Sequence, residues 1–152
     1  MKKPMKHFLL FLTGLTVFGM MSSCKEEGPH KDDIVKFSAV INSQPTVPKA
    51  VSTATGTGTF EYNKTTKELS YSINYQGLTP TFVKIEYANP AYERGAPLDV
   101  AANPTSNPVT GKFKLNDLQQ TYLILGLFYV NIYTNANIYG EIRGQILPNQ
   151  LD

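Results

Sequence analysis

From Ile34 onward, apolar and polar residues alternate along much of the chain, which is the period of β-strands whose two faces meet different surroundings. In residues 68–75 every second residue is apolar, namely Leu69, Tyr71, Ile73 and Tyr75. The same reading predicts strands over 34–41, 55–62, 68–75, 82–88, 109–115, 127–134 and 139–147, with a further short strand at 98–101. The chain is therefore expected to be built almost wholly from short strands.

The segments between the strands carry turn and loop residues. Residues 63–67 read as a tight turn that joins 55–62 and 68–75 into a hairpin, and the proline-bearing stretches 42–54 and 89–108 read as loops. One short helix is expected over 118–125, capped by Asn116 or Asp117 and ended by Gly126. About seven strands, one helix and no alternation of strands with helices predict an all-β fold, an antiparallel β sandwich.

The N-terminus does not follow the strand pattern. Three lysines, Lys2, Lys3 and Lys6, precede an apolar run from Phe8 to Met21. That run suits the core of an export signal and is too short to span a bilayer, which needs about 20 residues. Small residues and a cysteine follow in the segment Met21-Ser22-Ser23-Cys24, which resembles the lipobox of bacterial lipoproteins.

The lipobox resemblance implies that residues 1–23 are a signal peptide and that Cys24 becomes lipidated. Several acyl chains hold a protein stably on a membrane, where a single chain is marginal. The expected localisation is the cell envelope, with a lipid anchor in the outer membrane. The alternative is an ordinary secreted protein in which Cys24 is incidental. Residues 24–33 are the expected tether, and 34–152 the folded domain.

The residues just after Cys24 bear on which side of the membrane the domain faces. Lys25, Glu26 and Glu27 resemble a signal for export of lipoproteins to the cell surface. The alternative is a solvated tether with no such role, which the polar composition of the segment also allows. Both a surface-exposed and a periplasmic domain stay open.

Composition excludes several classes of function. Three of the 14 basic residues lie in the signal peptide, so the remainder nearly balance the 12 acidic residues, and no basic run in the domain suggests nucleic acid. Cys24 is the one cysteine, which rules out an internal disulfide. The domain also contains no histidine, so a Ser-His-Asp or Cys-His triad is excluded. No catalytic residue and no cofactor are expected.

Several segments resemble the CHRD domain, a family first described in chordin and widespread in bacterial secreted proteins. The likeness is carried by an opening strand with its proline loop, a central hairpin and a C-terminal signature: residues 37–48, 54–60, 69–73, 77–78, 126–134 and 140–146. The resemblance implies an immunoglobulin-like β sandwich over about residues 35–147. The family has no agreed enzymatic activity, and in chordin the domain belongs to a protein that binds signalling ligands.

The chain departs from the family at its histidines. Typical members carry an Ala-His-Ile-His motif and an Asn-Val-His-Thr motif, which here read Val83-Lys84-Ile85-Glu86 and Asn131-Ile132-Tyr133-Thr134. If those histidines bind a metal in other members, this protein is not expected to, because a protonated lysine cannot ligate and a lone carboxylate with a phenol is a poor site. Lys84, Glu86 and Tyr133 are instead expected to fill the same space as a polar cluster.

Three further polar residues are candidate site residues. Glu141 and Arg143 are two apart on an expected strand and so point to one face, either as a ligand-binding pair or, as we favour, as a structural charge pair. Asn131 lies between apolar neighbours and is expected to be a buried residue that hydrogen-bonds a nearby loop. The many tyrosines suggest protein or glycan binding where they are exposed, while Tyr71, Tyr75 and Tyr129 are expected in the core.

Three functional hypotheses follow. The first is an envelope-anchored lipoprotein whose CHRD-like domain has a non-enzymatic role in binding or structure, with an unidentified protein or glycan partner. The second is a metal-binding envelope protein related to the histidine-bearing members. The third is a hydrolase of extracellular polymers, which would need two of Glu61, Glu68, Glu86 and Glu141 to face one cleft.

Overall fold

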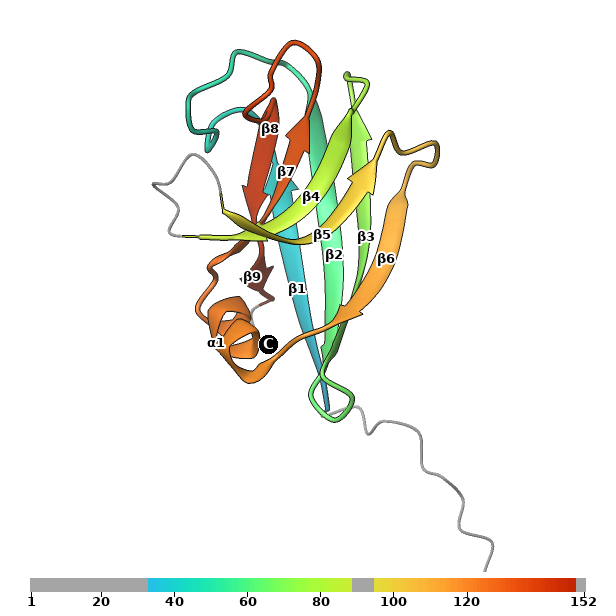
Figure 1. Cartoon of the computed structure of the whole chain (residues 1–152), viewed down its shortest axis with the longest axis vertical. Coiled ribbons are helices and arrows are strands. Elements are labelled where there is room, and N and C mark those ends of the chain that lie inside the picture. The colour runs from blue at the N-terminus through green and yellow to red at the C-terminus, as the bar shows by residue number, and fades with distance from the viewer. Residues whose placement is uncertain (1–32, 89–94, 150–152) are drawn as a thin grey trace, which may run out of the picture.

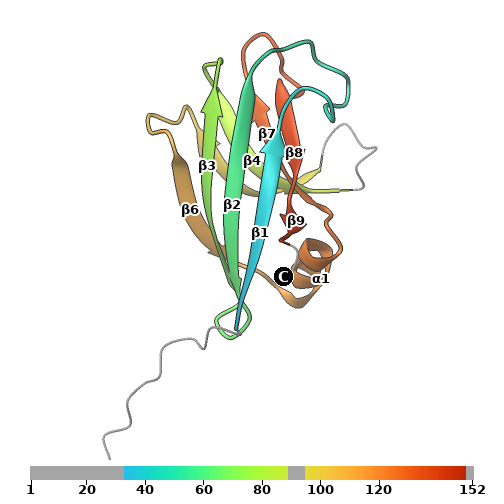
Figure 2. The ribbon, with the colours of Figure 1, turned by 180° about the vertical axis from the view of Figure 1, so that it is seen from behind.

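The chain folds into two antiparallel sheets packed face to face, as a computed structural model that describes residues 33–88 and 95–149 shows (Figure 1). The five-stranded sheet has the order β6 (Val109–Lys114), β3 (Glu68–Gln76), β2 (Thr55–Asn63), β1 (Ile34–Ile41), β9 (Leu147–Pro148). The four-stranded sheet has the order β5 (Ala96–Ala102), β4 (Phe82–Tyr87), β7 (Phe128–Tyr133), β8 (Ile142–Gln145). Turning the molecule brings the five-stranded sheet to the front (Figure 2).

The predicted class, an all-β antiparallel sandwich, is confirmed. The described residues form nine strands and one helix, and the predicted hairpin is β2 and β3, paired from Thr55↔Gln76 to Asn63↔Glu68. Alternation explains the layering, because β1 and β2 bury every second residue toward the other sheet. Phe37 of β1 lies opposite Phe60 of β2, and both rings are buried between the sheets.

The helix α1 (Asp117–Ile124) closes one end of the sandwich, and its two ends form as its sequence predicts. Asn116 is the N-cap, and its side chain accepts a hydrogen bond from the Gln119 amide while the Gln119 side chain accepts one from the Asn116 amide. Gly126 follows the helix with a φ of 70°, a left-handed conformation that glycine adopts without strain. Leu123 points inward and is fully buried.

The C-terminal segment differs from the expectation of one strand over 139–147. The structure has two shorter strands there, β8 and β9, which belong to different sheets. Gly140, with a φ of 115°, keeps the chain in a loop until Ile142, and the chain changes sheets at the buried Ile146. The short strand expected at 98–101 is the longer β5, so the strands number nine where about seven were expected.

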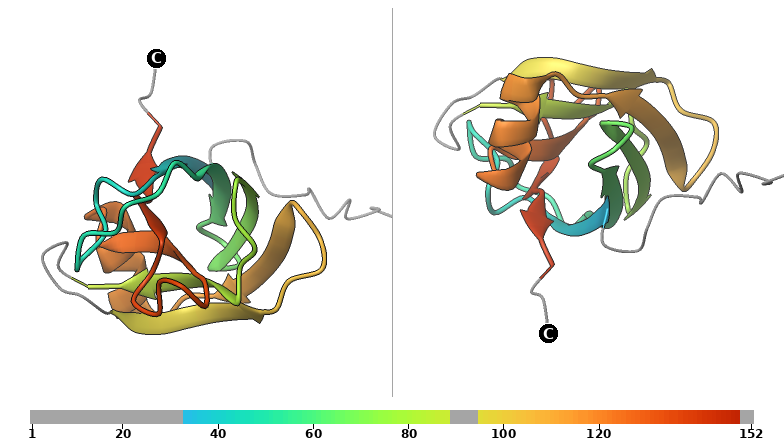
Figure 3. Two further views of the ribbon diagram at one scale, coloured as in Figure 1. Left: turned by 90° about the horizontal axis from the view of Figure 1, so that it is seen from above. Right: turned by 90° about the horizontal axis from the view of Figure 1, so that it is seen from below.

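Strand β8 also connects the two sheets at one edge. Asn42, just beyond β1, forms an antiparallel bridge with Arg143 of β8 through hydrogen bonds of 3.1 and 2.8 Å between their backbones. The sandwich is therefore closed along this edge, and the view from above shows the strands wrapping around a common core (Figure 3). This closure fixes β8, which carries part of the candidate site.

Several predictions fall outside the described residues: the signal peptide, Cys24, Lys25, Glu26, Glu27 and most of the tether. Among residues 33–88 and 95–149, no helix has the length and apolar character needed to cross a membrane.

Candidate functional site

The outward face of the four-stranded sheet carries polar side chains that are buried. Along β7 all six residues are buried, whereas strands of the five-stranded sheet bury only alternate residues. Lys84 of β4, Asn131 of β7 and Arg143 of β8 lie side by side across three strands of this face. Residues on the opposite face, such as Val130 and Ile132, form the core. The sheet thus has a polar layer on one side and the apolar core on the other.

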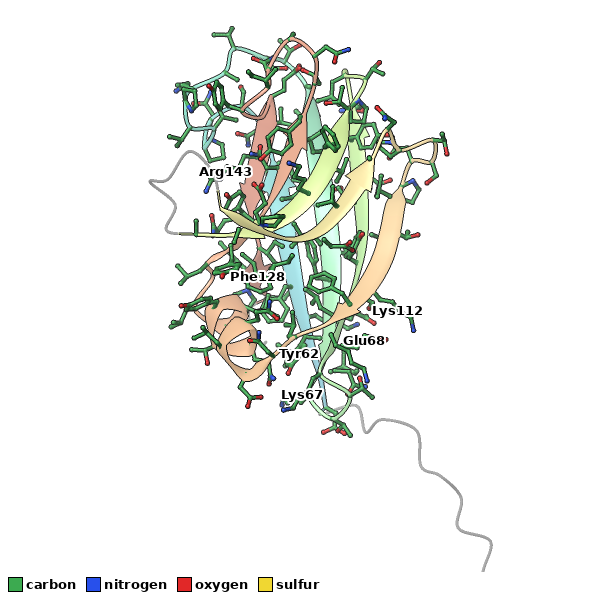
Figure 4. The ribbon with its side chains drawn as sticks, in the orientation of Figure 1. Tyr62, Lys67, Glu68, Lys112, Phe128 and Arg143 are labelled. Atoms are coloured by element: carbon green, nitrogen blue, oxygen red, sulfur yellow. The ribbon has the colours of Figure 1, made fainter. Side chains whose placement is uncertain are left out.

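Arg143 is the largest fully buried side chain of the described residues, with 2% of its surface exposed. Its guanidinium carbon lies 3.6 Å from the centre of the Tyr129 ring, a cation–π contact made strong by exclusion from water. Figure 4 shows Arg143 in the upper half of the domain, while Tyr62 and Lys67 lie near the lower end. The planar guanidinium and the flat ring hold β7 and β8 in register on this face.

Lys84, Glu86 and Tyr133 form the cluster expected at the positions of the family's histidines. The Tyr133 hydroxyl lies 2.9 and 3.0 Å from the two oxygens of the buried Glu86 carboxylate and donates to it. The Lys84 ammonium lies 4.4 Å from the Tyr133 ring centre and 5.0 Å from that of Phe82. The structure therefore brings all three residues together. The Tyr133 hydroxyl contacts the Glu86 carboxylate, and the Lys84 ammonium lies over the Tyr133 ring.

Burial raises the pKa of Tyr133 well above its usual range, and the neighbouring Glu86 carboxylate raises it further. The phenol therefore stays protonated at any physiological pH. It acts as a hydrogen-bond donor to Glu86 and not as a base.

A groove of about 540 Å³ opens over this cluster. Its lining combines charged, amide and hydroxyl groups with apolar and aromatic surface, from β4, the start of β5 and the loops that follow β5 and β7: Thr81, Phe82, Lys84, Glu86, Gly95, Pro97, Asn103, Tyr133, Thr134, Asn135 and Ile138. Phe82 and Ile138 are 38% and 64% exposed, so apolar surface is available to a ligand. The lining is therefore mixed, and it offers both hydrogen bonds and apolar contact to a ligand.

Asn131 lies beneath the loop that joins β7 to β8. It is 1% exposed, and its amide donates to the Tyr139 carbonyl at 3.2 Å. Gly140 packs directly on the Asn131 side chain, so closely that a Cβ atom at position 140 would overlap the amide. Asn131 therefore supports this loop from below and faces away from open solvent.

Glu141 ends the same loop and holds two loops together. Its carboxylate accepts hydrogen bonds from Ser52 at 2.7 Å, from Thr134 at 2.6 Å and from Asn137 at 3.1 Å. Burial acts to raise the pKa of Glu141, but these three hydrogen bonds act against it and hold the pKa below its usual value. Glu141 thus precedes β8 and serves the loops, while Arg143, two residues on, stacks on Tyr129.

The two acids of this region, Glu86 and Glu141, each accept hydrogen bonds from neighbouring side chains. In the described parts of the chain, no three side chains of His, Cys, Asp or Glu come close enough to hold a metal ion. The Glu86 carboxylate is occupied by the Tyr133 hydroxyl, and Glu141 by two hydroxyls and an amide.

Sequence reasoning missed several residues of the groove and of the loops around it. Phe82, Asn103 and Ile138 line the groove, and Ser52 and Asn137 hold Glu141. The run Thr134-Asn135-Ala136-Asn137 before Glu141 was the available signal, because hydroxyl and amide side chains often satisfy a carboxylate in a turn. Nothing in the sequence links Ser52 to Glu141, since 89 positions separate them. Of the tyrosines expected in the core, Tyr71 and Tyr75 are half-buried against the core between the sheets, while Tyr129 is fully buried on the outward face of β7, against Arg143.

Fold and site together define an antiparallel β sandwich with a polar layer buried beneath a groove on its smaller sheet. Comparison with known families finds the CHRD domain over residues 37–146. The match covers most of the chain, and the protein belongs to the CHRD domain family. A search of curated proteins finds no match.

Proposed function

We propose that this protein is an envelope lipoprotein, anchored through an acylated Cys24, whose CHRD domain works by binding and not by catalysis. The groove over Lys84, Glu86 and Tyr133 is the place where a protein or glycan partner docks. The anchor follows from the lipobox, and the binding role follows from the groove.

The observation that carries the binding role is the arrangement of groups around the groove. Glu86 and Tyr133 satisfy each other, so they form a rigid floor. Phe82 and Ile138 offer apolar contact at the rim. Lys84 and the amides of Asn103 and Asn135 offer polar contact at the same opening. Aromatic and apolar contact flanked by amides suits a glycan or a peptide segment.

The anchor is tested by mass spectrometry of the mature N-terminus and by protease treatment of intact cells. We expect an acylated Cys24 at the N-terminus, and loss of membrane association in Cys24→Ala. Digestion of the domain in intact cells, with a periplasmic marker preserved, would assign Lys25, Glu26 and Glu27 a role in surface export. Protection until lysis would place the domain in the periplasm. A mature protein without acyl chains would contradict the anchor.

The groove is tested by glycan arrays and by pulldown from envelope extracts, followed by affinity measurement on the ligand found. We expect Lys84→Ala and Phe82→Ala each to weaken binding about tenfold, equivalent to about 1.4 kcal/mol. The matched control is Lys112→Ala, which removes an exposed lysine from the five-stranded sheet. Equal loss in Lys84→Ala and Lys112→Ala would mean that the groove is not the site, and no reproducible ligand would count against the binding role.

A further inference from the structure

One end of the domain gathers the start of the described chain, a turn and the helix. The turn between β2 and β3 holds Asp33 at this end, since the Lys64 amide donates to the Asp33 carbonyl at 2.9 Å and the Thr65 hydroxyl to its carboxylate at 3.1 Å. Lys67 of the same turn forms an ion pair of 2.8 Å with Asp117 at the start of α1. The start of β1 and α1 therefore lie at the same end of the domain, as Figure 1 shows.

Four large aliphatic side chains are exposed around α1 at this end. Leu118, Ile124, Leu125 and Leu147 have exposed fractions of 57, 54, 65 and 51%. Leu118 and Leu125 are two helical turns apart and share one side of the helix. Leu147 lies against Gly126, 3.0 Å from where a Cβ atom would be, so β9 continues the surface of the helix. We call these four residues the α1 rim. Exposed aliphatic groups gathered in one place mark an interaction surface.

We propose that the α1 rim docks on the lipid bilayer that holds the anchor, an inference that rests on the proposed lipidation of Cys24. From Cys24 to Asp33 a fully extended chain spans at most about 30 Å, so the end of the domain that carries Asp33 stays within about that distance of the membrane. Tethering makes the docking step intramolecular, and a weak contact therefore suffices. Four aliphatic side chains entering the interfacial region supply the contact. Asp117, next to Leu118 of the rim, is paired with Lys67 and therefore repels acidic headgroups little.

Docking through the rim would set the direction in which the groove faces. Strand β7 begins next to α1 and ends at the loop that lines one side of the groove, so Phe82 and Ile138 of the groove lie at the end of β7 away from the rim (Figure 1). A domain resting on its rim presents Phe82, Lys84 and Ile138 away from the bilayer. The partner would then reach the groove without approaching the lipid surface.

The chain contains no tryptophan, so a single introduced tryptophan is an unambiguous reporter. The lipidated mature protein is reconstituted into vesicles of phosphatidylethanolamine and phosphatidylglycerol in which some acyl chains carry bromine, a quencher of tryptophan fluorescence. Leu125→Trp reports from the rim, and Leu147→Trp is a second reporter on β9. The matched control is Val51→Trp, since Val51 is 99% exposed in the loop beyond the far end of β1.

We expect bromine to quench the fluorescence of Leu125→Trp and Leu147→Trp strongly and to leave that of Val51→Trp unchanged. Equal quenching at all three positions, or none at the rim, would overturn the rim as the docking surface. If the fluorescence changes with protein concentration but not with bromine, the rim contacts a second copy of the protein, and docking on the bilayer is overturned. Failure of the anchor itself is distinguishable, because the protein would then not float with the vesicles, and the inference would fall with it.

Discussion

On both sheets, outward-facing polar residues alternate with apolar residues along the strands. The structure exposes those polar residues on one sheet and buries them on the other. On the five-stranded sheet, Lys36, Thr59 and Lys112 point outward and are exposed to water. On the four-stranded sheet, Glu86, Asn131 and Arg143 also point outward, yet each is at most 3% exposed. The difference lies in what covers them, because the backbone around Gly140 packs on Asn131 and that around Gly95 packs close to the Tyr129 hydroxyl. Polar residues on one face of a sheet therefore predict exposure to water only where no loop covers that face.

Polar groups on the open face and in the covered layer contribute differently to stability. A polar group on an open face exchanges its partner for water at little cost, and surface ion pairs contribute little. A polar group in a covered layer depends on its protein partners, and losing one leaves a buried atom unsatisfied. Substitutions on the covered face should therefore cost several times more than matched substitutions on the open face.

The largest expected effect is that of Arg143→Ala. The change removes a large buried side chain together with its cation–π contact to Tyr129, and we expect the free energy of unfolding to fall by about 3 kcal/mol. Lys112→Ala on the open face removes an ion pair of 3.3 Å to Glu68 and should cost less than about 0.5 kcal/mol. Urea denaturation followed by circular dichroism measures both. Similar costs for the two variants would show that the covered layer is no more important for stability than the open face.

The next effect is that of Gly140→Ala, with an expected loss of about 2 kcal/mol. The new methyl group strains a backbone with φ of 115° and pushes on the Asn131 amide beneath it. Gly126→Ala is the comparison, since its φ of 70° lies at the edge of the left-handed region that alanine enters at smaller cost, and its nearest neighbour is the flexible end of Leu147. Thermal unfolding of both variants should show a clearly greater loss at Gly140, and equal losses would mean that contact with Asn131 carries no weight.

A smaller effect is expected for Tyr133→Phe, which removes the hydroxyl that donates to Glu86. The buried carboxylate then lacks this donor, and the cost should be about 1–2 kcal/mol. The matched change is Tyr62→Phe in the five-stranded sheet, because the Tyr62 hydroxyl is buried without a hydrogen-bond partner among the described residues. That variant should be neutral or slightly more stable. Equal destabilisation would remove the distinction between the two hydroxyls.

The smallest effect is a pH dependence at Glu141. Its pKa is lower in the folded protein than in the unfolded chain, so its contribution is present above the ordinary value and is lost as the pH falls through the folded-state pKa. Glu141→Gln should therefore destabilise the protein near pH 7 by about 1 kcal/mol, and the difference from the wild type should shrink near pH 3. Urea unfolding at both pH values gives the comparison, and a difference that does not change with pH would contradict the role of the Glu141 charge.

The sequence predicted the strands well and the covered face poorly, for physical reasons. The alternation of apolar and polar residues shows which side chains share a face of a strand. It predicted the ends of β1, β2 and β3 to within one residue. The cap at Asn116 and the stop at Gly126 are local signals, and they predicted α1 equally well. Whether a face is covered depends on distant contacts such as that of Ser52 with Glu141, for which a single sequence holds no local sign.

The positions of the candidate site were also only partly predictable. Lys84 and Glu86 are two apart on one strand, so their common face followed from the pattern. That Tyr133 lies against both depends on the pairing of β4 with β7, which alternation alone does not specify. The family resemblance supplied that link, because it marked the three positions as equivalent to histidines.

The central claim is that these three positions still converge in space but now hold a self-satisfied cluster that serves as the floor of a binding groove. The most direct measurement is elemental analysis of the purified protein after dialysis against zinc or copper, next to a variant combining Lys84→His, Glu86→His and Tyr133→His. The account predicts that the wild type retains no stoichiometric metal and that the variant gains it, because three imidazoles at one place make a good site for either ion. A stoichiometric metal held by the wild type and lost in Glu86→Gln would contradict the account.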